Sequence, residues 1–207
     1  MSATVITYHR VMGRWEPNAR GRLAQAALML YAEQGFEKTT AAEIAARAGL
    51  TERTFFRHYA DKREVLFYGM DSLRDILVRA VADAPISAGP MEAVGAALQA
   101  VADMVQENPE YARRRNAVAS ANAELREREL IKLAELAAAM AGALRDRGIP
   151  EPAASLAAET GVAVYRVAFA RWTREPGQPD LPSILRESME ELRGVFASPG
   201  RLPVLGR

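Results

Sequence analysis

Cysteine is absent from this sequence of 207 residues. Its absence excludes disulfide bonds, thiolate nucleophiles and zinc sites held by thiolates. Histidine is scarce: His9 and His58 are the only two, and neither has a second imidazole at helical spacing or lies in an HExxH pattern. Nothing else in the sequence pairs a nucleophile with a base. We therefore expect no metal centre, no cofactor and no enzymatic activity.

Long apolar runs are also missing. Charged side chains interrupt the alanine-rich segments, so no stretch reaches the roughly eighteen apolar residues that a membrane span requires. The segment from Met1 to Val11 carries only Arg10 as a charge and lacks the long apolar stretch of a secretory signal. We expect a globular, cytoplasmic protein without a membrane partner.

A strong excess of one charge is absent as well, since the formal net charge is +1. This excludes the strongly basic proteins that coat nucleic acid non-specifically. The charge is unevenly distributed, because residues 10–70 contain ten Lys and Arg against seven Asp and Glu, a net charge of +3 that leaves −2 for the remainder. We expect any polyanion to bind the N-terminal third.

Apolar residues recur at helical spacing along most of the chain, and no alternating strand pattern competes with them. Proline and glycine divide the sequence into helix-length segments. These patterns predict an all-α protein of about nine helices. The boundary between two domains is placed near Met70, which gives an N-terminal domain of residues 12–69 and a C-terminal domain of residues 70–200.

The stretch from Thr40 to Tyr59 contains two short helical patterns separated only by Gly49 and Leu50. Thr40 and Glu43 have the spacing of a capping box, so the first helix is expected to begin at Ala41. Gly49 is suited to the left-handed conformation that ends a helix. The short connection predicts a helix-turn-helix.

The second helix of this motif is predicted from Thr51 to Tyr59, with Thr51 as its N-cap. Its spacing turns Phe55 and Tyr59 inward against the first helix. Both are expected to be core residues, so their loss would unfold the motif.

The outward face of this second helix carries the candidate DNA contacts. Its N-terminal residues would lie deepest in the major groove, so Arg53 and Thr54 are the candidates for base contacts, and Glu52 could accept from a cytosine amino group. Phosphate contacts are expected from Thr51, Arg57, His58 and Lys62. The complete candidate set is Thr40, Thr51, Glu52, Arg53, Thr54, Phe56, Arg57, His58 and Lys62.

The segment from Arg20 to Phe67 resembles the DNA-binding domain of the TetR family of one-component repressors. The resemblance rests on Gly35-Phe36, Thr39-Thr40, Ala48-Gly49, the Thr-Phe-Phe run at Thr54 to Phe56, and Asp61-Lys62. It implies a three-helix DNA-binding domain, a fourth linking helix from Asp61 to about Asp83, and a C-terminal domain that binds a ligand and dimerises.

Two positions depart from the family pattern. Arg53 stands where members often have a small residue, and Phe56 stands where they often have tyrosine, so operator preference cannot be transferred. Together with Arg113–Arg115, Glu124–Arg128 and Trp172, the Arg-Thr-Phe-Phe form is similar to an actinobacterial group that includes the mycofactocin-type regulator. This similarity implies a fatty-acyl effector such as an acyl-CoA.

Large apolar residues of the C-terminal domain are candidates to line an effector site: Met104, Tyr111, Tyr165, Phe169 and Trp172. Such residues are also typical of an ordinary core, so both interpretations stand. The arginines at 113–115 could bind an effector phosphate or carboxylate. The alternative is a solvated helix face that pairs with Glu124 and Glu127.

Two final helices, from about Glu151 to Thr173 and from Leu181 to Phe196, combine small and large apolar residues. By the resemblance they form a four-helix bundle with a second copy; the alternative is an ordinary pair within one chain. We expect a homodimeric repressor that binds a palindromic DNA operator and is released by a small apolar or acyl effector. A DNA-binding architectural protein without an effector and an all-helical enzyme are the alternatives.

Overall fold

The computed structural model describes residues 19–174 and 179–197. Nine α-helices, one 3-10 helix and no strand occur in these two ranges, which confirms the predicted all-α class. The elements are α1 (Ala19–Gln34), α2 (Ala41–Arg47), α3 (Glu52–His58), η2 (Glu64–Phe67), α4 (Met70–Asp83), α5 (Pro90–Gln106), α6 (Pro109–Ala121), α7 (Ala123–Asp146), α8 (Ala153–Arg174) and α9 (Leu181–Ala197).

The chain forms two compact units. One extends to Tyr68 and also includes Val118–Leu125, at the junction of α6 and α7; the other consists of Gly69–Ala117 and the chain from Arg126 onward. Residues 12–18 and 198–200, at the outer ends of the two predicted domains, lie outside the described residues. Val118–Leu125 falls inside the predicted second domain, residues 70–200, because no local pattern in the sequence shows which core this segment joins.

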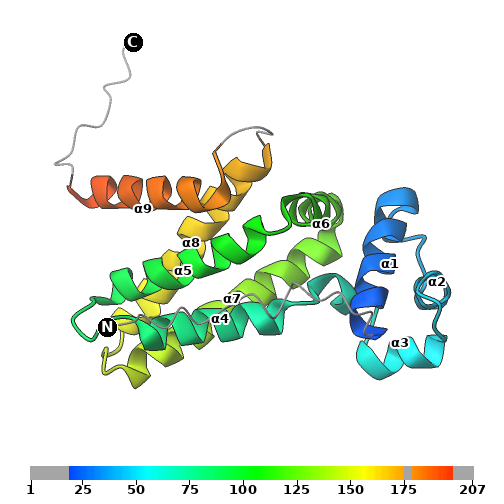
Figure 1. The fold of residues 1–207 in the computed structure, drawn as a ribbon, viewed down its shortest axis with the longest axis horizontal. Coiled ribbons are helices and arrows are strands. Elements are labelled where there is room, and N and C mark those ends of the chain that lie inside the picture. Colours follow the sequence, from blue (N-terminus) through cyan, green and yellow to red (C-terminus); the bar gives the residue numbers. More distant parts are fainter. Residues whose placement is uncertain (1–18, 175–178, 198–207) are drawn as a thin grey trace, which may run out of the picture. The chain divides into compact units, whose positions relative to one another are not determined.

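The first unit is built on α1, which packs against α2, α3 and η2 (Figure 1). Leu23 and Ala27 of α1 are fully buried, as their helical spacing predicts. Ile44 from α2 and Phe55 from α3 are also fully buried, so each short helix contributes an anchor to one core. Helices of seven residues have little stability alone and depend on this packing.

The predicted fourth helix, Asp61 to about Asp83, is interrupted in the structure. Glu64–Phe67 forms the 3-10 helix η2, and α4 begins only at Met70. The break lies at Gly69, whose φ of +95° is in the left-handed region that side chains rarely adopt. The expectation of one continuous helix was wrong because the apolar spacing runs through a residue whose backbone departs from helical geometry.

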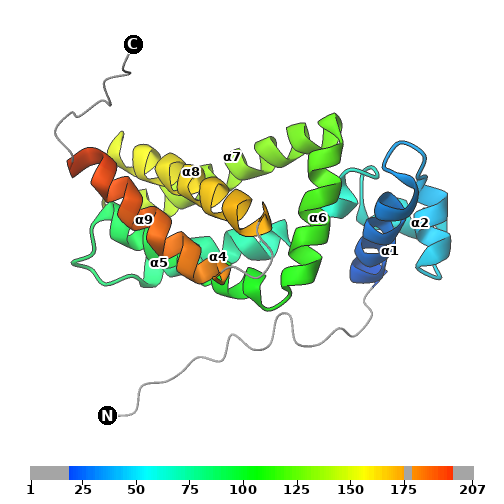
Figure 2. The same ribbon diagram turned by 90° about the horizontal axis from the view of Figure 1, so that it is seen from above.

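The second unit is organised around α5, which packs against α4, α8 and α9; Figure 2 shows α8 and α9 side by side. The approach of α5 and α8 is close at Gly161, where a Cβ atom would lie 2.4 Å from Cγ1 of Val94. Any larger residue at this crossing would force Val94 or one of the two helices to shift. No helix in the described residues combines the length and apolarity needed to cross a bilayer.

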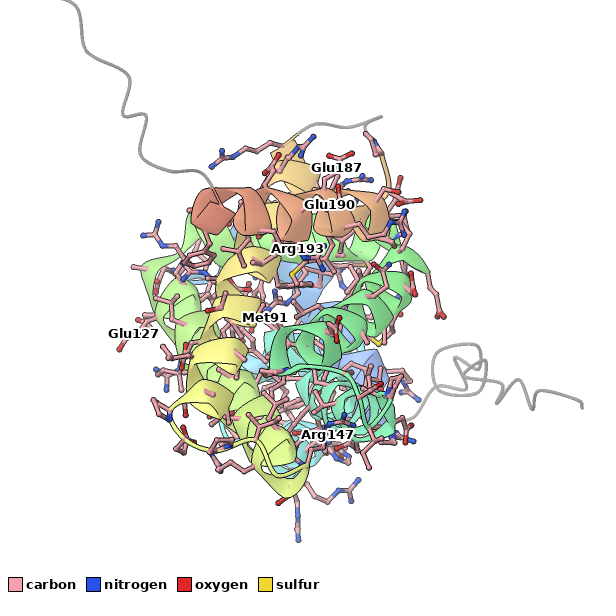
Figure 3. All side chains as sticks on the ribbon, turned by 90° about the vertical axis from the view of Figure 1, so that its left-hand side faces the viewer. Met91, Glu127, Arg147, Glu187, Glu190 and Arg193 are labelled. Carbon is pink, nitrogen blue, oxygen red and sulfur yellow. The ribbon has the colours of Figure 1, made fainter. Side chains whose placement is uncertain are left out.

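Arg147, labelled in Figure 3, stabilises the end of α4. Its guanidinium donates to the carbonyl oxygens of Val81 at 3.0 Å, Ala84 at 2.6 Å and Pro85 at 2.7 Å. The last carbonyls of a helix have no hydrogen-bond partner within the helix, and this end carries a partial negative charge. A cationic donor there satisfies the carbonyls and also interacts favourably with the helix dipole. The contacts join the C-terminal end of α7 to the α4–α5 turn.

Candidate functional site

The connection between α2 and α3 has the geometry of a helix-turn-helix. Thr40 caps α2: its Oγ1 accepts from the backbone N of Glu43 at 3.2 Å, and the Glu43 carboxylate accepts from the backbone N of Thr40 at 2.8 Å. Gly49 ends the helix with a φ of +66°. The predicted capping box and the predicted start at Ala41 are both confirmed.

Arg22 of α1 holds this turn, and the sequence analysis did not identify it. Its Nε donates to the carbonyl oxygen of Ala48 at 3.0 Å, and its Nη2 contacts the carbonyls of Ala48 and Gly49. An added Cβ at Gly49 would lie 3.3 Å from that Nη2 atom. The contact fixes α1 to the turn, so it sets the position of α3 indirectly.

Helix α3 begins after its N-cap, Thr51, whose Oγ1 accepts from the backbone N of Thr54 at 3.2 Å. Phe55 is fully buried and Tyr59 is nearly so, as predicted. The Tyr59 hydroxyl donates to the carbonyl oxygen of Arg20 at 2.9 Å. The inward face of α3 is therefore fixed against α1.

The outward face of α3 is available for a ligand. Glu52, Arg53 and Arg57 are exposed, and Phe56 retains 54% of its exposure, which is high for a phenyl ring. Within the described residues, no salt bridge engages Arg53 or Arg57. Two guanidinium groups one helical turn apart are thus presented on one exposed surface, beside an apolar ring.

His58 and Thr54 are less accessible than the neighbouring candidates, because both are half-buried. The Nε2 atom of His58 is buried and has no hydrogen-bond partner among the residues that the structure describes. Only part of each side chain is therefore presented to a ligand on this face.

Lys62 differs most from its expected role as a phosphate contact. Its ammonium donates to three backbone carbonyl oxygens, those of Phe36 at 2.8 Å, Thr39 at 3.0 Å and Glu37 at 3.2 Å. It also lies 4.2 Å from the centre of the Phe36 ring. An ammonium has three N–H donors, so these contacts account for all of them. In this geometry Lys62 fastens the α1–α2 loop, and a phosphate would have to displace a carbonyl.

The second candidate site is an aromatic row on α8. The rings of Tyr165 and Phe169 are stacked with their centroids 5.6 Å apart, and Phe169 lies 5.6 Å from Trp172. Trp172 is 1% exposed, while Tyr165 and Phe169 are half-buried. Burial raises the pKa of the Tyr165 hydroxyl above its ordinary value, so the phenol is neutral at physiological pH.

The other candidates of this domain lie on neighbouring helices. Met104 of α5 and Tyr111 of α6 are half-buried. Arg115 of α6 pairs with Glu129 of α7 at 2.6 Å, a partner that the sequence analysis did not name. Arg113 lies with its guanidinium carbon 4.3 Å from the centre of the Trp172 ring. In the described ranges no three metal-ligating side chains gather into a group.

Helices α8 and α9 also expose large apolar side chains. Val167 of α8 is 63% exposed, and Phe196 near the end of α9 is 80% exposed; Leu156 and Val195 are similarly accessible. An ion pair between Arg171 and Glu187, 2.9 Å long, joins the two helices. Figure 3 shows Glu187, Glu190 and Arg193 along α9, so charged residues share this helix with the apolar ones.

Two family models match the chain. The model described as "Bacterial regulatory proteins, tetR family" matches residues 23–68, and the model described as "MftR C-terminal domain" matches residues 88–197. The HTH-type transcriptional regulator TcmR of Streptomyces glaucescens is 34% identical over 88 residues. That match covers 42% of this chain and 39% of TcmR, well under two thirds of the relative's length.

Solved structures share the fold. FadR of Thermus thermophilus in complex with lauroyl-CoA is 24% identical with a TM-score of 0.56, over 91% of this chain and 100% of that one. The SmeT–triclosan complex is 22% identical with a TM-score of 0.63, over 91% and 98%; SmeT is the repressor of a Stenotrophomonas maltophilia multidrug efflux pump. FadR of Bacillus subtilis with stearoyl-CoA is 17% identical with a TM-score of 0.60, over 83% and 96%. These proteins are named as regulators and not as enzymes.

Proposed function

Since this chain belongs to the tetR family of bacterial transcriptional regulators, we propose that it is a homodimeric repressor that binds a near-palindromic operator and is released by an apolar or acyl effector. The observation that carries the proposal is the exposed face of α3, where Arg53 and Arg57 have no ion-pair partner in the described part of the chain. Such a protein acts on DNA in the bacterial cytoplasm.

The proposal assigns base contacts to the first turn of α3. Arg53 can donate two hydrogen bonds to O6 and N7 of guanine, which is the commonest specific contact in the major groove. Glu52 would accept from a cytosine amino group, and the exposed Phe56 ring would contact a thymine methyl group. Because Arg53 is long and has no ion-pair partner among residues 19–174 and 179–197, it would reach deeper into the groove than a small residue does.

Phosphate contacts would fix the register of the helix on the duplex. Arg57 lies one turn after Arg53 on the exposed face, and Thr51 and Thr40 lie at the N-termini of α3 and α2. Helix N-termini carry a partial positive charge and unpaired N–H groups, so phosphates are favoured there. His58 remains a candidate for this role, and Lys62 contributes instead by holding the loop in front of α2.

The proposed dimer uses the outer faces of α8 and α9. The exposed apolar residues Leu156, Val167, Val195 and Phe196 form the evidence for this interface. Apolar side chains exposed to this extent on neighbouring helices are typical of an association surface. The half-sites of a near-palindromic operator lie about 34 Å apart, one turn of DNA, so the two α3 helices of the proposed two-fold dimer would bind at this separation.

The proposed effector binds beside the aromatic row of α8. Two similar structures contain an acyl-CoA and one contains triclosan, which are molecules with large apolar parts. Tyr165, Phe169 and Trp172 supply apolar area of the corresponding kind, and we assign Met104 and Tyr111 to the same site. To release the protein from DNA, the effector needs only to bind the DNA-incompetent conformation more tightly than the DNA-binding conformation.

Residues Val118–Leu125 would transmit effector binding to the DNA-binding unit. Asn122, between α6 and α7, donates from Nδ2 to the Glu37 carboxylate at 2.8 Å, and Leu125 is fully buried. The carbonyl of the same Glu37 accepts from Lys62. A shift of α6 or α7 on effector binding would therefore change contacts in the loop that precedes α2.

The test is binding of the purified protein to labelled DNA fragments from around its own gene, with the salt concentration varied. We expect one fragment to bind selectively and Arg53→Ala to weaken that binding about tenfold or more. Arg126→Ala, which removes one exposed charge of α7, is the matched control and should bind normally. Equal, salt-sensitive binding to every fragment would contradict the proposal.

A further inference from the structure

The environment of Arg113 is unusual for a surface arginine. Its guanidinium carbon lies 4.3 Å from the centre of the Trp172 ring, which is 1% exposed. The Nε atom of Arg113 is buried and has no hydrogen-bond partner among the described residues. The cation is thus held against an aromatic face, and its Nε donor is satisfied by no acceptor in the part of the chain that the structure describes.

Such a donor calls for an explanation, because nearly all buried polar groups in proteins are hydrogen-bonded. Stacking on an indole ring stabilises the positive charge but offers no acceptor in the plane of the guanidinium. Arg115, two residues along the same helix, has a carboxylate partner in Glu129 at 2.6 Å. Helix α7 thus provides a carboxylate to Arg115, whereas the Nε of Arg113 has no acceptor among the described residues.

The apolar surroundings of Arg113 continue along α8. Trp172 lies 5.6 Å from Phe169, and Phe169 lies 5.6 Å from Tyr165, so three rings form a continuous row that ends beneath the guanidinium. Tyr165 and Phe169, which are half-buried, offer contact area to an apolar chain, and the cation at the end of the row offers charged hydrogen bonds. This is the pattern that an amphipathic molecule with one anionic group requires.

We propose that Arg113, held on the Trp172 ring, binds the oxyanion of the effector, a carboxylate or a phosphate, while the half-buried rings of Tyr165 and Phe169 contact its apolar part. The inference rests on the proposed function as an effector-responsive regulator and adds the chemical class of the effector. A guanidinium presents parallel N–H donors that match a planar carboxylate or two phosphate oxygens, and such charged hydrogen bonds are stronger than neutral ones. A neutral apolar molecule would leave the Nε donor unsatisfied.

Binding of three probes with a twelve-carbon acyl chain tests the proposal: laurate, lauroyl-CoA and methyl laurate. The chain has two tryptophans, so the background variant Trp15→Phe leaves Trp172 as the reporter of binding by its fluorescence. We expect at least one of the two anionic probes to bind about tenfold more tightly than the neutral ester. Preference for laurate identifies a carboxylate, and preference for lauroyl-CoA identifies a phosphate.

The variant Arg113→Met should reduce this preference to about twofold or less, and Arg113→Lys should restore part of it. Arg114→Met is the matched control, because Arg114 is exposed on the same helix and its loss removes the same charge. Thermal unfolding confirms that each variant folds. The result that supports the proposal is loss of head-group preference in Arg113→Met alone.

Three results would overturn the proposal: equal binding of ester and anions, an equal effect of the two methionine variants, or no binding of any probe. Operator binding without effector is measured for each variant, since the proposed function predicts that it persists in Arg113→Met. Loss of head-group preference in Arg113→Met with intact operator binding supports the role of Arg113 and leaves the proposed function unaffected. Failure of the wild-type protein to select any DNA fragment would instead contradict the proposed function.

Discussion

The ammonium of Lys62 lies 2.8 Å from the carbonyl oxygen of Phe36 and 4.2 Å from the centre of the same residue's ring. One side chain therefore fixes both the backbone and the aromatic group that end the first helix. Because the α1–α2 loop leads directly into the capping box of α2, this contact helps to position the helix-turn-helix from the side opposite its exposed face. Its role is distinguishable from that of a phosphate contact.

Replacement of Lys62 by methionine should lower the free energy of unfolding by about 2 kcal/mol, because it removes charged hydrogen bonds to three carbonyls. The measurement is chemical denaturation of the DNA-free protein. Lys38→Met, at an exposed position of the same loop, serves as the control and should leave stability nearly unchanged. A lysine that only binds phosphate would give unchanged stability and weaker DNA binding.

Gly161→Ala should destabilise the second unit by about 1–3 kcal/mol, because its new methyl group would lie 2.4 Å from Cγ1 of Val94. Valine is stiff at χ1 and cannot move aside easily. Gly142→Ala in α7 is the control, since its Cβ would meet only an arginine end at 3.7 Å and alanine favours the helix. The double variant Gly161→Ala with Val94→Ala should recover part of the lost free energy of unfolding. If it recovers none, the new methyl group does not clash with Val94.

The capping box of α2 should give a pH-dependent contribution to stability. The hydrogen bonds from the backbone N and the hydroxyl of Thr40 hold the pKa of Glu43 below its ordinary value of 4.5. A carboxylate with a lowered folded-state pKa stabilises the fold above its unfolded pKa, and this contribution is lost as pH falls through the lowered value. Glu43→Gln should therefore be less stable than wild type near pH 6 and nearly equal to it near pH 3, by denaturation at each pH.

Thr40→Ala removes the other half of the same box and should cost about 1 kcal/mol. The difference between the Glu43→Gln variant and wild type should then shrink in the Thr40→Ala background. A pH-independent difference in both backgrounds would show that the charge of Glu43 does not act through Thr40.

Val167→Glu should separate the proposed dimer. Val167 is 63% exposed in the single chain, so a charge there leaves the subunit fold intact and is buried only on association. We expect the dimer dissociation constant to rise about thirtyfold or more in analytical ultracentrifugation, and operator affinity to fall with it. Ile86→Glu, at a fully exposed position in the α4–α5 turn, should remain dimeric. Dimerisation unaffected by Val167→Glu would exclude this face of α8.

The parts of the fold that follow from local chemistry were predictable from the sequence. Thr40, Glu43 and Gly49 fix the ends of α2, and the spacing of Phe55 and Tyr59 gives the inward face of α3. These features depend on residues within one or two turns of each other, where periodicity and capping apply.

The long-range contacts from side chains to backbone carbonyls were not predictable in the same way. Arg22, Lys62 and Arg147 all donate to backbone carbonyls 23 to 66 residues away in the sequence. Any exposed arginine or lysine has the donors for such a contact, so residue type carries no signal of it. The break at Gly69 was hidden for a related reason, because apolar spacing continued across it.

The most direct test of DNA reading by α3 in a dimer is a hydroxyl-radical footprint of the protein on its selected operator. We expect two protected half-sites related by two-fold symmetry, with centres about one helical turn apart, and loss of both in Arg53→Ala. Addition of the anionic effector should abolish the protection in wild type, and Arg113→Met should need about tenfold more effector for the same loss. Uniform protection without symmetry, or a footprint that Arg53→Ala leaves unchanged, would contradict the claim that α3 reads DNA as part of a dimer.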